Sequence, residues 1–300
     1  VQVTKKWDDA NNQDGLRPAS ITVRLYKDGA PTDQTLELSE ANQWHGTFEN
    51  LDVNAAGKAL NYTVKEENVP EGYTLSIDDK DPAHLVLTNK HEPTVTQVKV
   101  TKKWDDANNQ DGLRPKEIRV QLYAGDQKLG KEVVLSADNK WTHTFEKLAE
   151  KANGQAIHYS VKEVDVPEGY TVTEESKEKG DVVLTNTHAP STVDIPVTKI
   201  WLDNDNQDGL RPAKITVKLL ANGGEVARKD ITSETDWKET FTGLPKFKDG
   251  KEIVYTLQEE KVENYSPSID QESYTITNTH TPGKTTLSVT KQSPYLWSVG

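Results

Sequence analysis

The stretch Val3-Thr4-Lys5-Lys6-Trp7 returns after 97 residues, and again after another 97, as Val100-Thr101-Lys102-Lys103-Trp104 and Val197-Thr198-Lys199-Ile200-Trp201. Side chains of a β-strand alternate between its two faces, so Val3, Lys5 and Trp7 share one face. Valine and tryptophan mark that face as buried. We therefore expect Lys5, Lys102 and Lys199 in the core, where a lysine is almost never found without a compensating partner.

Two further strand patterns supply candidate partners for these lysines. Tyr62-Thr63-Val64-Lys65-Glu66 and its two copies place a tyrosine, an aliphatic residue and a glutamate on one face, which directs Glu66, Glu163 and Glu259 inward. Near the end of each repeat, segments such as Leu85-Val86-Leu87-Thr88-Asn89 put an asparagine in phase with inward apolar residues, at Asn89, Asn186 and Asn278. Each repeat therefore supplies one inward lysine, one inward glutamate and one inward asparagine.

The repeat length divides the 300 residues into three domains and a tail, which we place at residues 1–95, 96–192, 193–282 and 283–300. Proline in junctions such as His91-Glu92-Pro93 indicates stiff connections. Alternating residues such as Ile21, Val23 and Leu25, separated by turn pairs such as Asp28-Gly29, predict an all-β class with about seven short strands per domain, arranged as a sandwich. In the tail, Val289-Thr290-Lys291 resembles the first strand, but Ser293 replaces the tryptophan, and we assign the tail no function.

Composition excludes several function classes. The formal net charge is −12 and no basic patch opposes it, so we expect neither nucleic acid nor an anionic membrane as partner. No stretch approaches the roughly 18 apolar residues of a membrane span, so we expect no membrane insertion. Cysteine is absent, which removes thiol catalysis and most structural zinc sites. The chain opens on neither methionine nor a signal peptide, so we expect a piece of a longer protein.

The loops rich in Asp and Asn, such as Asp8 to Gly15, raise the possibility of calcium binding. An EF-hand loop requires a glutamate at its twelfth position, and the third copy has Ile215 there, so we favour a solvated turn and expect no metal or cofactor. We expect His91, His188 and His280 to pack or cap rather than bind metal. No nucleophile motif of hydrolases is present, so we do not expect an enzyme that acts on an external substrate.

A longer motif carries a family resemblance. Lys-x-Trp, an Asp-rich loop and Asn-Gln-Asp-Gly-Leu-Arg-Pro occur at Lys5–Pro18, Lys102–Pro115 and Lys199–Pro212. Together with Val69-Pro70-Glu71-Gly72-Tyr73, its copy at Val166–Tyr170 and the closing Thr-Asn-x-His, the motif resembles the Cna B-type domain over about residues 1–282.

The resemblance implies three tandem prealbumin-like, inverse immunoglobulin-like β-sandwiches. It also implies, in each, a self-formed isopeptide bond between a lysine of the first strand and an asparagine of the last, promoted by a buried glutamate or aspartate. The matching residues are Lys5, Glu66 and Asn89, then Lys102, Glu163 and Asn186, then Lys199, Glu259 and Asn278. Repeat 3 departs from the pattern, with Val262-Glu263-Asn264-Tyr265 at the turn and 19 rather than 23 residues from glutamate to asparagine.

The chemistry of these residue types fits such a bond. An amine attacks a carboxamide only when it is neutral, and burial lowers the pKa of a lysine while it raises that of a glutamate. We expect the carboxyl group to hydrogen-bond the side-chain oxygen of the asparagine, polarise its carbonyl and relay a proton to the departing ammonia. The alternative is a buried Lys–Glu salt bridge with asparagine as hydrogen-bond partner, although such pairs seldom add net stability.

The function that we expect is a rigid, protease-resistant stalk of a Gram-positive bacterial surface adhesin. It would lie outside the cell, anchored to the cell wall through a signal that these residues lack. Its partners would be other domains of the same protein, and a host matrix would be reached only through domains absent here. Two alternatives stay open: a module whose loops bind a matrix protein or glycan, and a pilin subunit.

Overall fold

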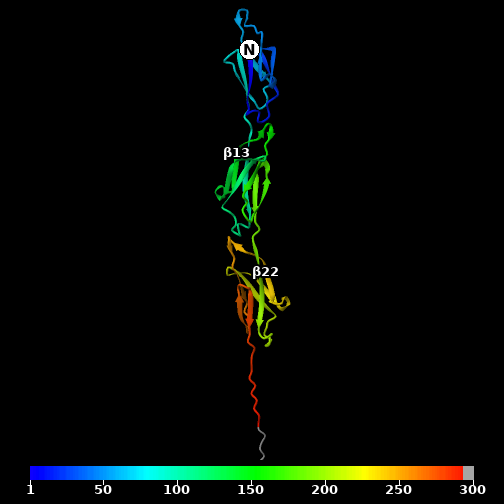
Figure 1. Ribbon diagram of the computed structural model, residues 1–300, viewed down its shortest axis with the longest axis vertical. Helices are drawn as coiled ribbons and strands as arrows, with labels where there is room; N and C mark the ends of the chain where they lie inside the picture. The colour runs from blue at the N-terminus through cyan, green and yellow to red at the C-terminus, as the bar shows by residue number, and fades with distance from the viewer. Residues whose placement is uncertain (293–300) are drawn as a thin grey trace, which may run out of the picture. The chain divides into compact units, whose positions relative to one another are not determined.

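The computed structural model describes residues 1–292. Ser293, which stands where the other repeats have a tryptophan, lies outside the described residues. The described residues form strands, numbered β1 to β27, with four short 3₁₀ turns and no α-helix among them. Figure 1 shows the ribbon built from these strands. By the density of its contacts the chain divides into two compact units. The first holds residues 1–103, 115–167 and 171–186, and the second holds residues 104–114, 168–170 and those from 187 on.

Repeat 1 forms two sheets and a small hairpin. The four-stranded sheet has the order β4 (His45–Thr47), β1 (Gln2–Asp8), β9 (His84–Lys90), β8 (Thr74–Asp78). The three-stranded sheet has the order β3 (Ala30–Ser39), β2 (Ser20–Lys27), β7 (Tyr62–Glu67). The hairpin joins β5 (Asn54–Ala55) to β6 (Lys58–Ala59), and a 3₁₀ turn, η1 (Glu40–Asn42), follows β3.

Repeat 2 repeats this plan. Its larger sheet has the order β13 (Thr142–Ala149), β10 (Val95–Asp105), β18 (Val182–Thr187), β17 (Thr171–Ser176). Its smaller sheet has the order β12 (Gln127–Ser136), β11 (Glu117–Ala124), β16 (Tyr159–Val164). The hairpin is β14 (Lys151–Ala152) with β15 (Gln155–Ala156), and the 3₁₀ turns are η2 (Ala137–Asn139) and η3 (Glu178–Gly180).

Repeat 3 has the same two sheets. Its larger sheet has the order β22 (Lys238–Pro245), β19 (Thr192–Leu202), β27 (Thr275–Thr279), β26 (Ser266–Asp270). Its smaller sheet has the order β21 (Gly224–Thr232), β20 (Lys214–Ala221), β25 (Tyr255–Glu259). The hairpin is β23 (Phe247–Lys248) with β24 (Lys251–Glu252), and the 3₁₀ turn is η4 (Ser233–Thr235). The predicted all-β class with three tandem sandwiches is confirmed, while the predicted domain boundaries stay a prediction.

The first and last strands of a repeat are parallel neighbours, and this pairing positions the predicted site. In repeat 1, β1 pairs with β9 so that Lys5 lies opposite Leu87 and Trp7 opposite Asn89. Repeat 3 keeps the same register, with Trp201 opposite Asn278. Because side chains alternate along each strand, the lysine and the asparagine face the same side of the sheet.

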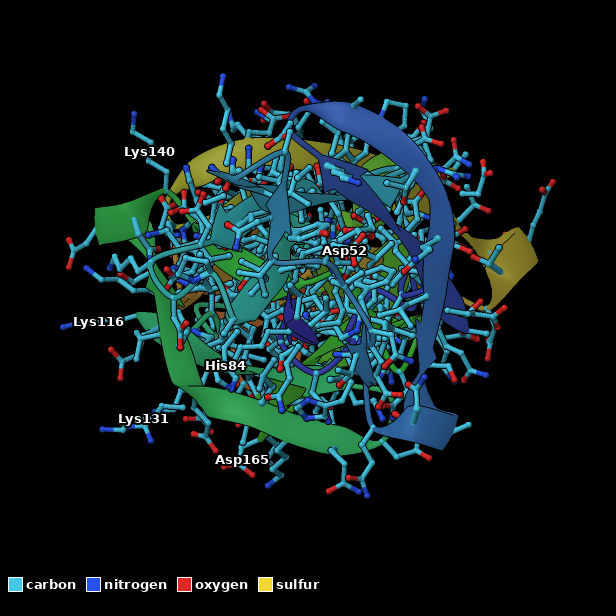
Figure 2. The ribbon with its side chains drawn as sticks, turned by 90° about the horizontal axis from the view of Figure 1, so that it is seen from above. Asp52, His84, Lys116, Lys131, Lys140 and Asp165 are labelled. Atoms are coloured by element: carbon cyan, nitrogen blue, oxygen red, sulfur yellow. The ribbon has the colours of Figure 1, made fainter. Side chains whose placement is uncertain are left out.

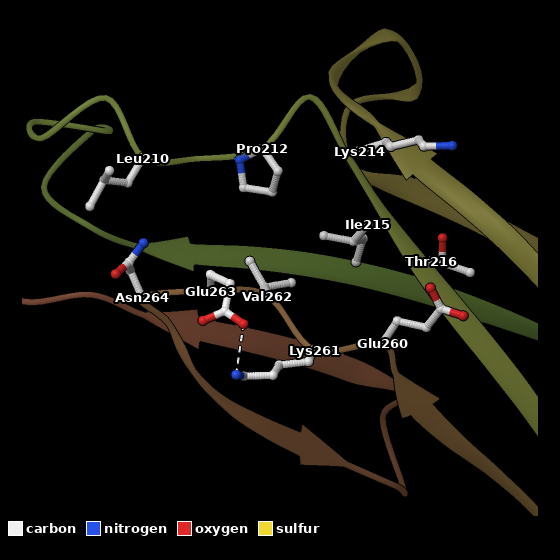
Figure 3. Close-up of a pocket in the computed structure, with 10 residues that line it drawn as sticks. All are labelled: Leu210, Pro212, Lys214, Ile215, Thr216, Glu260, Lys261, Val262, Glu263 and Asn264. Carbon is white, nitrogen blue, oxygen red and sulfur yellow. Dashed lines mark ion pairs between the residues drawn. The ribbon is translucent and has the colours of Figure 1, made fainter.

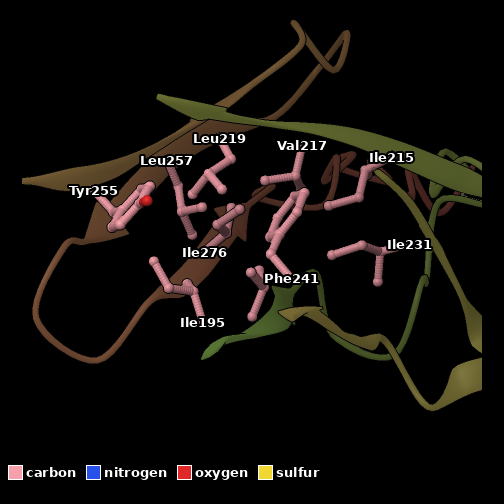
Figure 4. Close-up of a cluster of buried hydrophobic side chains, with 10 residues drawn as sticks. Ile195, Ile215, Val217, Leu219, Ile231, Phe241, Tyr255, Leu257 and Ile276 are labelled. Atoms are coloured by element: carbon pink, nitrogen blue, oxygen red, sulfur yellow. The ribbon is translucent and has the colours of Figure 1, made fainter. Parts of the chain in front are cut away.

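Both sheets of a repeat contribute to its core. Figure 4 shows this for repeat 3, where inward residues of the smaller sheet, such as Val217 and Leu257, pack with Ile195, Phe241 and Ile276 of the larger one. Repeat 1 has an equivalent cluster around Val23 and Leu87. Charged side chains such as Lys116, Lys131 and Lys140 project outward (Figure 2). Each sandwich therefore encloses an apolar interior in which a charged group has little water to solvate it.

Candidate functional site

In repeat 1 the three predicted residues meet at one carboxylate. Lys5 comes from β1 and Asn89 from β9 of the larger sheet, while Glu66 comes from β7 of the smaller sheet. The Nζ atom of Lys5 donates to Oε2 of Glu66 at 3.0 Å, and Nδ2 of Asn89 donates to Oε1 of Glu66 at 2.9 Å. The side chains of the lysine and the glutamate are 0% exposed. The glutamate therefore bridges the two sheets at the ends of both partner side chains.

Repeat 3 has the same arrangement despite its shorter loop. Nζ of Lys199 donates to Oε2 of Glu259 at 3.0 Å, and Nδ2 of Asn278 donates to Oε1 at 2.5 Å. The chain between glutamate and asparagine is shorter outside the site itself. The turn that links β26 to β27 and the part of β27 before Asn278 are both shorter than their counterparts between β8 and Asn89. The departure from the motif leaves the geometry of the three residues intact.

Repeat 2 brings the same residues together more loosely. Nδ2 of Asn186 donates to Oε1 of Glu163 at 3.1 Å, but Nζ of Lys102 lies 3.9 Å from that oxygen and donates to the carbonyl of Lys103 at 3.2 Å. Oε2 of Glu163 is buried without a hydrogen-bond partner among the described residues. Lysine and glutamate are again 0% exposed. A movement of Nζ of Lys102 by about one ångström would bring it within hydrogen-bond distance of Oε1 of Glu163.

Burial shifts proton affinities in these sites in the direction that the reaction requires. Desolvation lowers the pKa of Lys5, although its hydrogen bond and charge interaction with Glu66 act the other way. The same cause lowers the pKa of Lys199 to about 8. Desolvation raises the pKa of Glu163, against the opposing effects of Lys102 and Asn186. Both trends favour a neutral amine beside a protonated carboxyl group.

Comparison with known proteins identifies the family. The sequence profile of the Cna protein B-type domain matches residues 1–90, 98–187 and 195–279. The chain belongs to the Cna B-type domain family. It is 36% identical to a collagen adhesin of Staphylococcus aureus over 96% of this chain, and it spans about a third (32%) of that protein's length.

A solved structure of two B repeat units of the collagen binding protein of Staphylococcus aureus is also similar to this chain. The two are 43% identical with a TM-score of 0.59, and the match covers 94% of this chain and 74% of that one. The three B-type domains of this chain therefore share their fold with repeat units of a bacterial surface protein.

The orientation of the asparagine differs from what we expect from the sequence. In all three B-type domains the amide nitrogen, and not the oxygen, contacts the glutamate. The side-chain oxygens of Asn89, Asn186 and Asn278 are buried and have no hydrogen-bond partner among residues 1–292. A carboxylate can only accept hydrogen bonds, so it selects the amide nitrogen, and only a protonated glutamate could donate to the oxygen.

The sequence reasoning missed a second buried carboxylate in each B-type domain. Asp9 is 2% exposed and accepts two hydrogen bonds from Arg17, at 3.1 and 2.7 Å, and one from the hydroxyl of Tyr73 at 2.7 Å. The backbone N–H of Asn12 adds a fourth at 3.0 Å. The expectation of a solvated turn is therefore wrong for this aspartate. The guanidinium group supplies the charge that permits its burial.

The altered turn of repeat 3 preserves this network. Tyr265 donates to Oδ2 of Asp203 at 2.8 Å, as Tyr73 does to Asp9. Asn264 takes a φ of 69°, close to the left-handed conformation that Gly72 adopts with a φ of 85°. Asparagine tolerates this conformation better than most residues, which explains how the turn forms without glycine.

The recurring histidines cap the end of each B-type domain. His91 lies 2.8 Å from the carbonyl oxygen of Gly72 through Nδ1 and 2.7 Å from Oδ2 of Asp14 through Nε2. The same aspartate oxygen accepts the backbone N–H of Thr94, in the junction that follows, at 2.9 Å. Equivalent contacts join His188 to Asp111 and His280 to Asp208. The histidine pattern predicts a cap, but its aspartate partners, each 97 residues apart, were not recognised.

Two hollows on the described surface lie away from the three sites. Figure 3 shows one in repeat 3, about 270 Å³ in volume, with the ion pair of Lys261 and Glu263 (2.7 Å) at its edge. A larger one in repeat 2, about 1000 Å³, has Val98, Ile157 and Val182 in its lining. No lysine, glutamate or asparagine of the triads lines either hollow. Within residues 1–292 no three His, Cys, Asp or Glu side chains are grouped to hold a metal ion, and no helix is long and apolar enough to cross a membrane.

Proposed function

We propose that this chain is part of the stalk of a Gram-positive cell-surface adhesin, and that each domain is stabilised by a self-formed Lys–Asn isopeptide bond. The observation that supports the bond is the meeting of Lys5 and Asn89, from the first and last strands, at the buried carboxylate of Glu66. The equivalent residues meet in the other two repeats. The bonds would be Lys5–Asn89, Lys102–Asn186 and Lys199–Asn278.

The reaction exchanges one amide for another. A proton passes from Nζ of Lys5 to Glu66, which leaves a neutral amine and a carboxylic acid. Nζ then attacks Cγ of Asn89, forming the new C–N bond and a tetrahedral intermediate. The bond from Cγ to Nδ2 breaks, and ammonia leaves with the proton that the amine gives up. Each domain reacts once with itself, so no external substrate is turned over.

The geometry supports the glutamate as the proton carrier. In repeats 1 and 3 one carboxylate oxygen contacts the attacking nitrogen and the other contacts the leaving nitrogen. A proton taken from the amine through one oxygen can therefore reach ammonia through the other. Folding holds all three groups together, and such positioning can supply roughly 7–11 kcal/mol of the barrier. Contact of the carboxyl group with the asparagine oxygen would require rotation of the amide.

Such a bond would suit a stalk. It would join the two neighbouring strands through which the chain enters and leaves a domain, so a pulling force would pass from one strand to the other without loading the interior. An amide also resists reduction, unlike a disulfide. By analogy with disulfide loop closure, the link would stabilise each domain by about 4–5 kcal/mol through the unfolded state.

Intact mass under denaturing conditions tests the bond. We expect the wild-type chain to be lighter than its sequence by three ammonia molecules. Glu66→Ala, Glu163→Ala and Glu259→Ala should each restore one, and the triple variant should have the full sequence mass. Tandem mass spectrometry of a digest should locate the branched peptides at the named pairs. A wild-type chain of full sequence mass would overturn the proposal.

The similarity to a collagen adhesin of Staphylococcus aureus raises a second function, direct binding of collagen by these domains. We propose instead that other parts of the longer protein bind a matrix ligand. Near-identical loops in all three repeats favour a structural role for these domains, because a specific binding surface would be expected in one repeat only. Immobilised collagen tests this choice. We expect no binding of this chain, and saturable binding would favour the adhesive alternative. The cell wall is the place where such a stalk would act.

A further inference from the structure

A close backbone contact links repeat 1 to repeat 2 within the first compact unit. The tip of the hairpin β14–β15 meets the Asp-rich loop of repeat 1, and the N–H of Gly154 donates to the carbonyl of Gln13 at 3.0 Å. A Cβ atom added to Gly15 would lie 2.5 Å from Cα of Gly154. The approach therefore requires glycine on the loop side, and φ values of 73° and 77° favour glycine on both sides.

The second compact unit contains the same contact between repeats 2 and 3. The N–H of Gly250, at the tip of β23–β24, donates to the carbonyl of Gln110 at 3.0 Å. A Cβ atom on Gly112 would lie 2.5 Å from Cα of Gly250. The same donor, acceptor and glycine pair thus recur one repeat further along the chain.

The contact has two halves, a glycine at a hairpin tip and a glycine in an Asp-rich loop, and each also occurs once without the other half against it. Gly57, at the tip of the hairpin β5–β6, has a φ of 73°, and a Cβ there would have no atom of the described residues within 4 Å. The same holds for Gly209 in the Asp-rich loop of repeat 3, with a φ of 69°. That loop is built like the others, because the N–H of Gly209 bonds to Asn206 at 2.9 Å as that of Gly15 does to Asn12 at 3.0 Å.

We propose that the hairpin of residues 54–59 and the loop of residues 205–209 are docking surfaces, each of which takes a further B-type domain of this kind. Both surfaces are made of glycine and backbone polar groups, so their natural complement is the glycine-bearing half that the other repeats supply. This proposal concerns contacts between domains and does not depend on the isopeptide bond.

The sequence after repeat 3 supports the same occupant. Lys102 stands at the eleventh position after His91, Lys199 at the eleventh after His188, and Lys291 likewise at the eleventh after His280. The Leu-Ser-Val-Thr-Lys stretch that ends at Lys291 therefore stands where the first strand of another repeat would begin. A repeat joined at that spacing would bring its hairpin to the loop of Gly209, as repeats 2 and 3 bring theirs to the preceding loops.

The existing contact can be tested in the chain itself, which has no cysteine of its own. Spin labels on Asp33→Cys and Lys131→Cys would report the distance between repeats 1 and 2. We expect Gly154→Val to abolish a narrow distance distribution. Gly57→Val is the matched control, because it carries the same backbone strain without a neighbour, and it should leave the distribution narrow. Equal effects of the two substitutions would overturn the proposal.

The open surfaces can be tested in a tandem of two copies joined from Thr286 to Val1, which keeps the next Lys5 at the eleventh position after His280. Labels on Ser233→Cys of the first copy and Asp33→Cys of the second would report the new junction. Gly57→Val in the second copy, silent in the single chain, should now abolish the narrow distribution, and so should Gly209→Val in the first copy. A junction that is broad without substitution, or unaffected by both, would refute the docking surfaces.

Discussion

Lys5 and Asn89 project from parallel neighbouring strands two positions out of register, since the residue opposite Asn89 is Trp7. Their side chains reach the two oxygens of a single carboxylate that is supplied by the other sheet. This relationship makes the first and last strands of the domain the pair that a covalent link would join. It also decides how the domain would respond to force.

The first prediction concerns extension under load. Asn89 is 84 positions after Lys5, which at ~3.4 Å per extended residue corresponds to roughly 290 Å of chain. The bond would prevent this part of the chain from extending under force. Single-molecule stretching of the wild-type chain should show no extension of that size, whereas Glu66→Ala should release one. Glu259→Ala should release a smaller step of roughly 270 Å, because Asn278 is only 79 positions after Lys199. Identical traces for wild type and Glu66→Ala would contradict the load-bearing bond.

The second prediction separates the ion pair from the bond. Lys5→Met and Glu66→Leu each prevent cross-linking, and each leaves its partner buried and unpaired, which typically costs about 3–5 kcal/mol. The double variant removes both charges, so it should be more stable than either single variant. Urea unfolding of the three proteins provides the comparison. A double variant as unstable as the sum of the singles would mean that the two residues do not interact.

The triads could be predicted from the sequence because two regularities constrain them. The period of two assigns Lys5, Glu66 and Asn89 to inward faces. Recurrence of the three strand patterns supports the assignment in three copies, although the glutamate and the asparagine of repeat 3 follow those of repeat 2 after 96 and 92 residues rather than 97. Sequence periodicity does not reveal which strands are neighbours, so the strand pairing that brings the three side chains together could be expected only from the family resemblance. The asparagine orientation could not be predicted either, because it depends on whether the glutamate carries a proton.

The loops were predicted less well for a physical reason. A polar, glycine-containing loop normally lies in solvent, yet Asp9 and Asp14 are buried because side chains distant in sequence supply their hydrogen bonds. Tyr73 and His91 reach these carboxylates only after the chain has folded. The available signal was the recurrence of an aspartate and a histidine in every repeat, 77 residues apart in repeats 1 and 2 and 72 apart in repeat 3. Alternation of apolar residues cannot reveal it.

The third prediction concerns the buried hydroxyl of Tyr73. Tyr73→Phe removes a hydrogen bond to the charged Asp9, which should cost about 1.5–3 kcal/mol of unfolding free energy. Tyr62→Phe is the matched control, because that hydroxyl donates at 2.7 Å to the neutral backbone carbonyl of Asp52 at an exposed site. Its cost should stay near about 0.5–1.5 kcal/mol. Urea unfolding followed by the fluorescence of Trp7, which packs edge-on against Tyr73, measures both, and a larger cost for Tyr62→Phe would refute the assignment.

The fourth prediction is a pH dependence of the cap between Asp14 and His91. The hydrogen bond to Asp14 raises the pKa of His91, and the hydrogen bond to His91 lowers that of Asp14. The histidine's contribution to stability is fully present below its ordinary pKa of 6.5 and is lost as the pH rises through its raised folded-state pKa. The aspartate's contribution is present above its ordinary pKa of 3.8 and is lost as the pH falls through its lowered value. The cap should therefore be strongest between about pH 4 and 6.5.

Nuclear magnetic resonance of the imidazole signals can measure this directly, with repeat 2 as the control. Asp14→Asn removes the charge and the strongest acceptor that face His91, so it should lower the pKa of His91 and leave that of His188 unchanged. Asp111→Asn should do the reverse, because His188 depends on Asp111 in the same way. If Asp14→Asn left the titration of His91 where it is in the wild type, the carboxylate would not be the cause of the raised pKa. The gain in stability from the cap would then have no reason to fade as the pH rises.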